Sequence, residues 1–250
     1  MISVVNVHKR FGSQVVLDGV SLEIEKGKTT TIVGPSGVGK SVLLKLIMGI
    51  LNPEKGEVFV CGENITKAET EHERNLIRRH LGVLFQSAAL FDSLTVYDNV
   101  LFPLVERGEI KCREEMHRMV EEMLYSLSLE DHALSYPEEI SIGMRKRVGM
   151  ARALVTKPDI LLFDEPNTGL DPLVGQEVYD LIAESKEKWG FTGVVISHEL
   201  PEVFQVSDTV VMLLRGNIVM QGSPEDFINT DNAEVQQFLY GRTDGPIRIQ

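Results

Sequence analysis

The most constraining feature of the sequence is the octapeptide GPSGVGKS at residues 34–41. It fits the pattern G-x-x-x-x-G-K-[S/T], the segment TTTIVG at 29–34 that leads into it has the pattern of a buried strand, and helical periodicity begins at Lys40. In such a strand–loop–helix setting the glycines let the backbone wrap tightly, so that its N–H groups point at phosphate oxygens. The full spacing disfavours a plain turn and predicts a nucleotide-phosphate loop. Its residues are Gly34, Pro35, Ser36, Gly37, Val38, Gly39, Lys40 and Ser41. Lys40 would reach the β- and γ-phosphates, and Ser41 would hold Mg²⁺.

A second motif, ILLFDEP at residues 160–166, places two acids after four apolar residues. A buried strand that runs into two acids exposes them at its carboxyl end, where ligands bind in open α/β sheets. We expect Asp164 to hold Mg²⁺ and Glu165 to orient and deprotonate an attacking water. Since one carboxylate is then free of the metal, the pair favours hydrolysis over transfer to a second substrate.

The order of the elements predicts an α/β fold with a mostly parallel sheet covered on both faces. Strand patterns occur at 1–7, 15–24, 29–34, 56–60 and 81–85 and in the segments 159–166 and 193–199, and a hairpin turns at 215–217. Helices are expected at 113–129 and 172–189. The first carries an apolar stripe at i, i+3, i+4 and i+7 that favours packing on a neighbouring helix.

Charge and cysteine content exclude several classes of protein. The net charge of −12 argues against a nucleic-acid partner. The cysteines, Cys61 and Cys112, fit no metal-binding spacing and are typical of a reducing cytosol. We expect neither a secretory signal nor a membrane-spanning segment, so any membrane role must come through a partner.

Five further motifs appear in the order found in the ATP-binding subunits of ABC transporters, which the chain resembles over nearly its whole length. The resemblance implies that Phe11 in KRFG stacks on adenine, and that Gln86 in LFQS contacts Mg²⁺ and the water. His198 in VISHE would contact the γ-phosphate. The signature turn would be ISIGM at 140–144, and NTGLDP at 167–172 would carry Asp171 across a dimer interface.

The family resemblance also implies an architecture. It is one domain over residues 1–250: a P-loop NTPase (RecA-like) core, an N-terminal antiparallel β subdomain, an inserted α-helical subdomain at about 87–150 and a C-terminal extension at about 233–250. Two copies would form a head-to-tail dimer. ATP would lie between the phosphate loop of one copy and Ser141 and Gly143 of the other. Opening and closing of this dimer would be transmitted to a separate integral membrane permease.

Within the family, residues 87–104, Met144 and the tail at 235–247 resemble the Mla-type (Mce-associated) phospholipid transporter ATPases. This resemblance implies phospholipid transport between inner and outer membrane, with the chain on the cytoplasmic face of the inner membrane. It also implies a periplasmic-side Mce lipid carrier and a small STAS-type cytoplasmic subunit. Apolar residues at 88–91 would suit a groove for a coupling helix of the permease, or would be ordinary core. The tail would fray or pack on the partner ATPase.

Three alternatives stay open from the sequence. An importer of amino acids, metals or another lipid would differ only near Gln86 and in the tail. A soluble ABC protein acting on DNA or ribosomes would carry a long coiled coil or a second cassette, and neither pattern is visible. A small-molecule kinase with a phosphate loop would not need the signature turn.

One position departs from the family pattern, because Ile142 stands where the family has glycine. If this residue has a helical φ, isoleucine is tolerated, whereas a required positive φ or a close backbone approach would weaken closure of the dimer. The basic residues 145–147 that follow would add positive field near the phosphates or form a solvated face.

Overall fold

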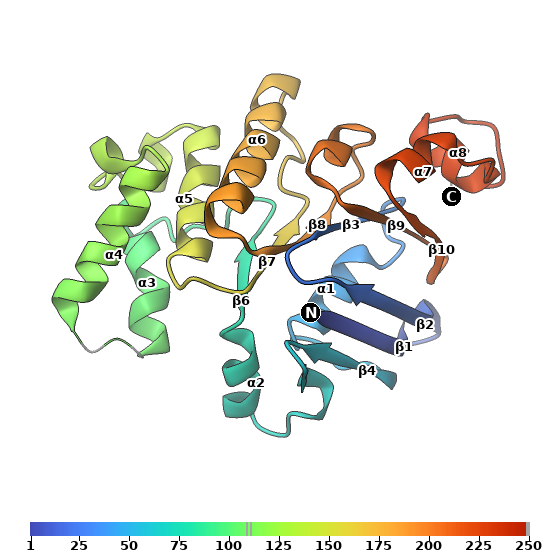
Figure 1. Cartoon of the computed structure of the whole chain (residues 1–250), viewed down its shortest axis with the longest axis horizontal. Helices are drawn as coiled ribbons and strands as arrows, with labels where there is room; N and C mark the ends of the chain where they lie inside the picture. The colour runs from blue at the N-terminus through green and yellow to red at the C-terminus, as the bar shows by residue number, and fades with distance from the viewer. Residues whose placement is uncertain (109, 111, 249–250) are drawn as a thin grey trace.

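The computed structural model describes residues 1–108, 110 and 112–248, and in this part of the chain the strands form two sheets (Figure 1). The smaller sheet is antiparallel, with the order β2-β1-β4-β5. Its strands are β1 (Ile2–Phe11), β2 (Gln14–Ile24), β4 (Lys55–Val60) and β5 (Glu63–Asn64). It is the N-terminal antiparallel subdomain that the family resemblance implies.

The larger sheet has the order β10-β9-β3-β8-β7-β6. Its strands are β3 (Thr29–Val33), β6 (Leu81–Leu84), β7 (Ile160–Asp164), β8 (Thr192–Ile196), β9 (Thr209–Leu214) and β10 (Asn217–Gly222). All neighbours pair in parallel except β10, which pairs antiparallel with β9 at one edge. β3 and β8 are buried along their whole length, as expected for parallel strands covered on both faces. The predicted α/β fold with a mostly parallel sheet is confirmed.

Helices cover the larger sheet and form a separate group at one end of the molecule (Figure 1). They are α1 (Lys40–Ile47), α2 (Glu71–Arg78), α3 (Val96–Arg107), α4 (Arg113–Ser126), α5 (Ile142–Leu154), α6 (Pro172–Trp189), α7 (Pro224–Asn229) and α8 (Ala233–Leu239). Short 3₁₀ turns occupy Ile65–Lys67, Glu130–His132, Pro137–Glu139 and Glu202–Val206. In α4, Val120, Met123 and Leu124 are buried, so the predicted stripe packs against neighbouring helices.

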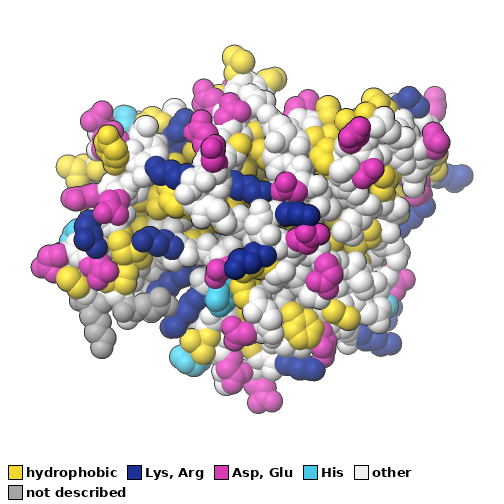
Figure 2. All heavy atoms as spheres, viewed as in Figure 1, with side chains coloured by type: hydrophobic (Ala, Val, Ile, Leu, Met, Phe, Trp, Pro, Cys, Tyr) yellow, Lys and Arg dark blue, Asp and Glu magenta, His cyan; other side chains and the backbone are white. Residues whose placement is uncertain are grey.

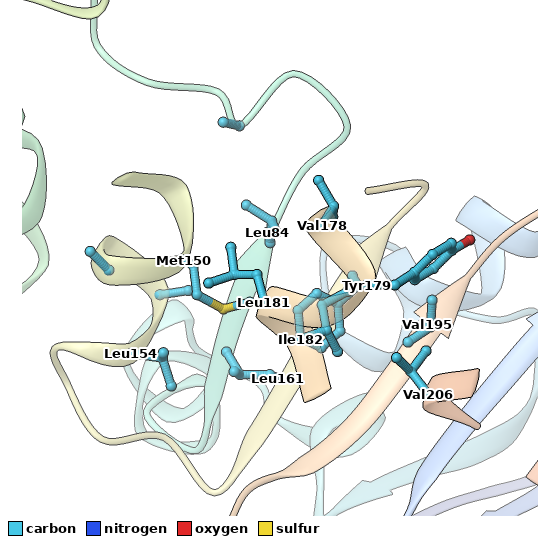
Figure 3. Close-up of a cluster of buried hydrophobic side chains, with 14 of the residues drawn as sticks. Leu84, Met150, Leu154, Leu161, Val178, Tyr179, Leu181, Ile182, Val195 and Val206 are labelled. Atoms are coloured by element: carbon cyan, nitrogen blue, oxygen red, sulfur yellow. The ribbon is translucent and has the colours of Figure 1, made fainter. Parts of the chain in front are cut away.

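The core on one face of the larger sheet joins α5 and α6 to the strands (Figure 3). Met150 and Leu154 of α5 and Ile182 of α6 lie beside Leu161 of β7, and each is at most 2% exposed. Burying such a side chain contributes about 1.5–3 kcal/mol. This packing fixes the helix that begins with the signature turn relative to the strand that ends in Asp164.

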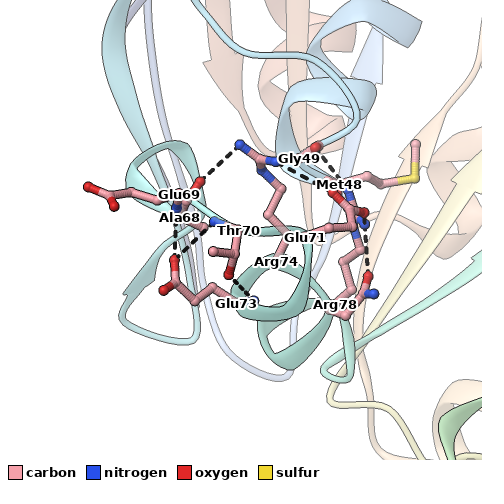
Figure 4. Close-up of polar contacts among 10 residues, drawn as sticks. Met48, Gly49, Ala68, Glu69, Thr70, Glu71, Glu73, Arg74 and Arg78 are labelled. Atoms are coloured by element: carbon pink, nitrogen blue, oxygen red, sulfur yellow. Dashed lines mark hydrogen bonds and ion pairs between the residues drawn. The ribbon is translucent and has the colours of Figure 1, made fainter.

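A capping box sets the start of α2 (Figure 4). The Thr70 hydroxyl accepts from Glu73 N–H, while the Glu73 carboxylate accepts from the N–H groups of Glu69 and Thr70. Arg74 and Arg78 then donate to the carbonyls of Ala68, Met48 and Gly49. These bonds anchor α2 to the end of α1 and so place the residues that lead into β6.

The described part of the tail packs on its own chain, so it is not frayed. α8 buries Val235, Gln237 and Leu239. Gln237 exchanges two hydrogen bonds with the backbone of Ile247, and Arg215 donates to Pro246 O. The expectation of a frayed terminus was wrong because the apolar contacts are spread over a helix of only seven residues, while packing on the partner ATPase stays a prediction.

Two surface properties bear on function. No helix in the described residues combines the length and the apolar character needed to cross a membrane. Figure 2 shows basic side chains interspersed with acidic and hydrophobic ones on the face in view, without a wide basic patch.

Candidate functional site

The predicted site residues gather because their strands are parallel neighbours. The phosphate loop follows β3, Asp164 ends β7 and His198 follows β8, which lies between those two strands. The segment with Gln86 follows β6, beside β7. Carboxyl ends of parallel strands meet at one edge of the sheet, and this edge is the usual ligand site of open α/β folds.

The phosphate loop needs its glycines for close packing and for positive φ. A Cβ on Gly34, which has φ 146°, would lie 2.2 Å from the carbonyl oxygen of Leu213. Gly39 has φ 109° and is the N-cap of α1, with no side chain capping the helix. The first N–H groups of α1 therefore remain available to an anion at the helix terminus.

Lys40 is buried at the start of α1 and is 4% exposed. Its Nζ donates to Gly34 O at 2.8 Å and to Pro35 O at 3.0 Å, and lies 3.9 Å from Glu165 Oε1. Burial lowers the pKa of Lys40, although the charges of Glu165 and Asp164 oppose that shift. A phosphate beside Nζ would offset the cost of burying this cation.

Ser41 and Asp164 form a pair of oxygen donors. Ser41 Oγ donates to Asp164 Oδ1 at 3.3 Å. Burial raises the pKa of Asp164, which means that the ionised carboxylate is short of compensating positive charge. Hydroxyl and carboxylate oxygens are ligands that Mg²⁺ prefers, so the pair could hold this ion.

Glu165 occupies a strained position between the buried cation and the histidine. Its φ is 49°, and its N–H donates to Ile196 O at 3.0 Å. Oε1 lies 3.4 Å from His198 Nδ1, without hydrogen-bond geometry among the described atoms, and Oε2 accepts from Thr168 Oγ1 at 3.2 Å. A non-glycine residue held at positive φ is a frequent property of functional sites.

The other predicted residues are not brought to the phosphate loop within one chain. Phe11 ends β1, is 49% exposed and lies under Lys9 Nζ, 5.3 Å from the ring centroid. Ser141 is the N-cap of α5, Gly143 lies in its first turn, and Asp171 is the N-cap of α6. In the described part of the chain, no hydrogen bond or ion pair links these residues to the loop.

The structure answers the question of the backbone conformation at Ile142. The residue is the first of α5 and is absent from the positive-φ residues of the described chain. Its side chain is 54% exposed. The φ of residue 142 therefore does not require glycine, and the effect of a close approach by a second copy stays a prediction.

Lys146 is a site residue that the sequence did not single out, because it stands in a run of basic residues. It is 3% exposed, and Nζ donates to Gln86 O and to Pro166 O. Burial lowers the pKa of Lys146 to about 8. One side chain thus ties α5 to the segments carrying Gln86 and Glu165, which corrects the expectation of a solvated face.

An apolar groove lies beside Gln86, with Phe85, Ala89, Phe91 and Phe102 among its lining residues. Phe91 and Phe102 are 42% and 37% exposed, with ring centroids 4.6 Å apart. Of the two readings of residues 88–91, Ala88 follows that of ordinary core, because it is 1% exposed. Ala88 and Ala89 have φ 59° and 45°, and Arg152 donates to Ala88 O and Ala89 O.

A wide pocket of about 1110 Å³ adjoins the phosphate loop. Residues 14–16, 35–38 and His198 form one wall, and tail residues between 237 and 248 form another. The C-terminal tail therefore borders the phosphate loop in the same chain.

Comparisons with known proteins agree with this geometry. Residues 17–168 match the family model described as "ABC transporter". The chain is 37% identical over 251 residues to the intermembrane phospholipid transport system ATP-binding protein MlaF of Haemophilus influenzae, covering 100% of this chain and 94% of that one. It is 41% identical over 246 residues to the probable ribonucleotide transport ATP-binding protein mkl of Mycobacterium leprae, covering 98% and 70%.

A solved structure gives the same result. The chain is 31% identical to the ATP-binding cassette MJ0796, solved as a dimer in a post-hydrolysis state with ADP and Pi. The TM-score is 0.79, and the match covers 90% of this chain and 99% of that one.

Proposed function

Because the chain belongs to the ABC transporter family, we propose that it is the ATPase subunit that powers phospholipid transport between inner and outer membrane through a separate permease. The chain is an ATP-binding and ATP-hydrolysing protein by its family. The observation that carries the rest is similarity to an intermembrane phospholipid transport ATP-binding protein over the full length, tail included.

The phosphate loop binds the triphosphate in this proposal. Backbone N–H groups of residues 34–41 and the buried ammonium of Lys40 meet the phosphate oxygens. Ser41, Asp164 and Gln86 hold Mg²⁺, which when bound neutralises phosphate charge and polarises the bond to be broken. The 3.3 Å separation of Ser41 Oγ and Asp164 Oδ1 supports this assignment.

Glu165 is the general base, with His198 beside it. Glu165 Oε1 takes a proton from the attacking water, and Oε2 is held by Thr168. His198, which contacts Glu165 Oε1 at 3.4 Å, orients the γ-phosphate. Gln86 places the water and reports to the permease.

The site is completed by a second copy in a head-to-tail dimer. Phe11 stacks on adenine, while Ser141 and Gly143 of the other copy present the amino end of α5 to the γ-phosphate. Asp171 lies at the same interface. Within one described chain, Ser141, Gly143 and Asp171 have no hydrogen bond or ion pair with the phosphate loop, and this supports their acting on the loop of the other copy.

The permease docks on the apolar groove beside Gln86. Phe85, Phe91 and Phe102 offer an exposed apolar surface that suits the apolar side of a short coupling helix. The ATPase is thereby a peripheral protein on the cytoplasmic face of the inner membrane. A periplasmic-side Mce lipid carrier and a small STAS-type subunit complete the assembly, and nucleic acid is not a partner.

The proposed domain division follows from the same picture. Residues 1–250 form one ATPase domain, with the helical subdomain at about 87–150 and the C-terminal extension at about 233–250. The described extension packs on its own chain, which supports a role close to the nucleotide site.

A second candidate function is transport of another substrate, because mkl is called a probable ribonucleotide transport protein. Co-purification separates the candidates. The complex with its permease should carry glycerophospholipid, identified by mass spectrometry, and should move labelled phospholipid in proteoliposomes when ATP is added. Bound nucleotide cargo without lipid would contradict the phospholipid assignment.

Two variants test the chemistry. Glu165→Gln keeps the hydrogen bond from Thr168 but cannot take a proton, so ATP should still bind, turnover should stop and a dimer should accumulate. Lys40→Ala should lose nucleotide affinity. A normal hydrolysis rate in the first, or unchanged ATP binding in the second, would show that the residue roles are wrong.

A further inference from the structure

We propose that Cys61, His80 and Asp159 form a binding site for a divalent transition-metal ion of the Zn²⁺ class. One potential ligand atom from each of these three residues lies within 4.8 Å of the others. His80 Nδ1 is 2.5 Å from Asp159 Oδ2, and His80 Nε2 is 3.7 Å from Glu63 Oε1. The cysteine spacing did not indicate this site, because the ligands come from three distant segments.

The site lies at the edge of the larger sheet opposite to the phosphate loop. His80 precedes β6 and Asp159 precedes β7, so both stand at the amino ends of parallel strands. Asp164 stands at the carboxyl end of the same β7, about 17 Å away for a five-residue strand. An ion here would therefore be distinct from Mg²⁺ at the nucleotide.

Cys61 occupies a backbone position that disfavours it. It begins the two-residue turn between β4 and β5, where Val60 pairs with Glu63, and Cys61 and Gly62 have φ 52° and 88°. Turns with positive φ at both central residues favour Asn, Asp or Gly, so cysteine costs stability there. Binding chemistry that needs sulfur at this point explains the choice.

The ligand set selects the class of ion. A thiolate with imidazole and carboxylate oxygens suits Zn²⁺ and its neighbours, whereas Mg²⁺ takes oxygen ligands alone. Tetrahedral zinc bond lengths place ligand atoms about 3.3–3.6 Å apart. The ligand atoms, which lie within 4.8 Å of one another, would have to move closer together, with the His80–Asp159 hydrogen bond exchanged for bonds to the ion.

The three ligands come from three separate segments, because Cys61 lies in the turn after β4, His80 precedes β6 and Asp159 precedes β7. The bound ion would fasten the β4–β5 turn of the smaller sheet to β6 and β7 of the larger sheet.

Cobalt titration of the whole, untagged chain tests the proposal. One Co²⁺ ion should bind per chain and give a thiolate-to-cobalt charge-transfer band. Addition of Zn²⁺ should abolish this band, whereas addition of Mg²⁺ should leave it unchanged. Cys61→Ser should remove the band. Cys112→Ser is the matched control, because this exposed cysteine donates to Glu114 and is not part of the cluster, so the variant should keep the band.

Thiol labelling followed by mass spectrometry gives a second readout. Zn²⁺ should slow modification of Cys61 at least tenfold and leave Cys112 unchanged. If Cys61→Ser does not fold, Asp159→Asn keeps the hydrogen bond to His80, removes one charged ligand and should weaken Co²⁺ binding at least tenfold while ATP binding is retained. Absence of a thiolate band, a band lost in Cys112→Ser, or equal labelling of both cysteines would overturn the site.

Discussion

Replacing Lys146 by methionine tests whether one buried side chain connects α5 to both halves of the hydrolysis site. Methionine has a similar length but cannot donate to Gln86 O and Pro166 O, which accept from Lys146 Nζ. The change therefore removes both hydrogen bonds without placing a larger side chain in the core.

The effect on stability can be bounded from the structure. Two charge-assisted hydrogen bonds are lost, at about 1.5–3 kcal/mol each. Burial lowers the pKa of Lys146 from 10.5 to about 8. Because methionine carries no charge to bury, the variant avoids this cost, which stabilises it by about 3 kcal/mol. The net destabilisation should be about 0–3 kcal/mol, so the variant stays folded.

The effect on turnover should be larger than the effect on stability. Without Lys146 Nζ, the segments carrying Gln86 and Glu165 move independently of α5. We therefore expect the rate constant for ATP hydrolysis to fall at least about tenfold, which corresponds to an activation free energy higher by about 1.4 kcal/mol. Chemical denaturation and steady-state ATPase assays of the permease complex measure the two quantities. Arg147→Met is the matched control, because it removes a charge from the same helix and should change the rate much less. The proposed role of Lys146 would be refuted by equal ATPase rates for Lys146→Met and wild type, or by equal losses of rate in Lys146→Met and Arg147→Met.

Further outcomes follow from the same structure. The native pKa of Lys146 lies below its unfolded value, so between pH 8 and 10.5 the unfolded chain binds more protons there. The free energy of unfolding of wild type should thus rise relative to Lys146→Met over that window, and denaturation at several pH values measures it. Ile142→Gly should cost at most about 1 kcal/mol and leave the ATPase rate within about twofold, since residue 142 is already helical. A marked fall would instead show that isoleucine contacts the partner, and a marked rise that it obstructs closure. Phe11→Ala should raise the KM for ATP with little change in kcat, and an unchanged KM would remove Phe11 from the adenine site.

The sequence sufficed for features that depend on local pattern. The strand pattern at residues 29–34 placed β3 within a residue, the segment 159–166 contains β7, and parallel pairing then brought Lys40, Ser41 and Asp164 to one edge. The positive φ of Glu165 and its contact with His198 depend on β8 lying beside β7, which no local pattern contains.

What the sequence could not predict depends on which polar groups end up buried. Lys146 stands between two arginines, and nothing in the run RKR distinguishes it. Its burial follows from the orientation of α5, which the local sequence does not determine. For residues 88–91 the sequence left both readings open, and Ala88 proves to be core while Ala89 and Phe91 are exposed. Cys61, His80 and Asp159 meet only when two sheets come together.

The strand order has a consequence for how the chain folds during synthesis. β3 pairs with β8 on one side and β9 on the other, so the strand below the phosphate loop has both neighbours only after residue 214 has emerged. Pairings so distant in sequence form slowly, and β3 waits with its apolar faces uncovered while some 160 residues are added. A nascent chain halted before β8 should be unable to retain ATP and should be bound by chaperones, whereas one halted after β9 should acquire nucleotide binding abruptly.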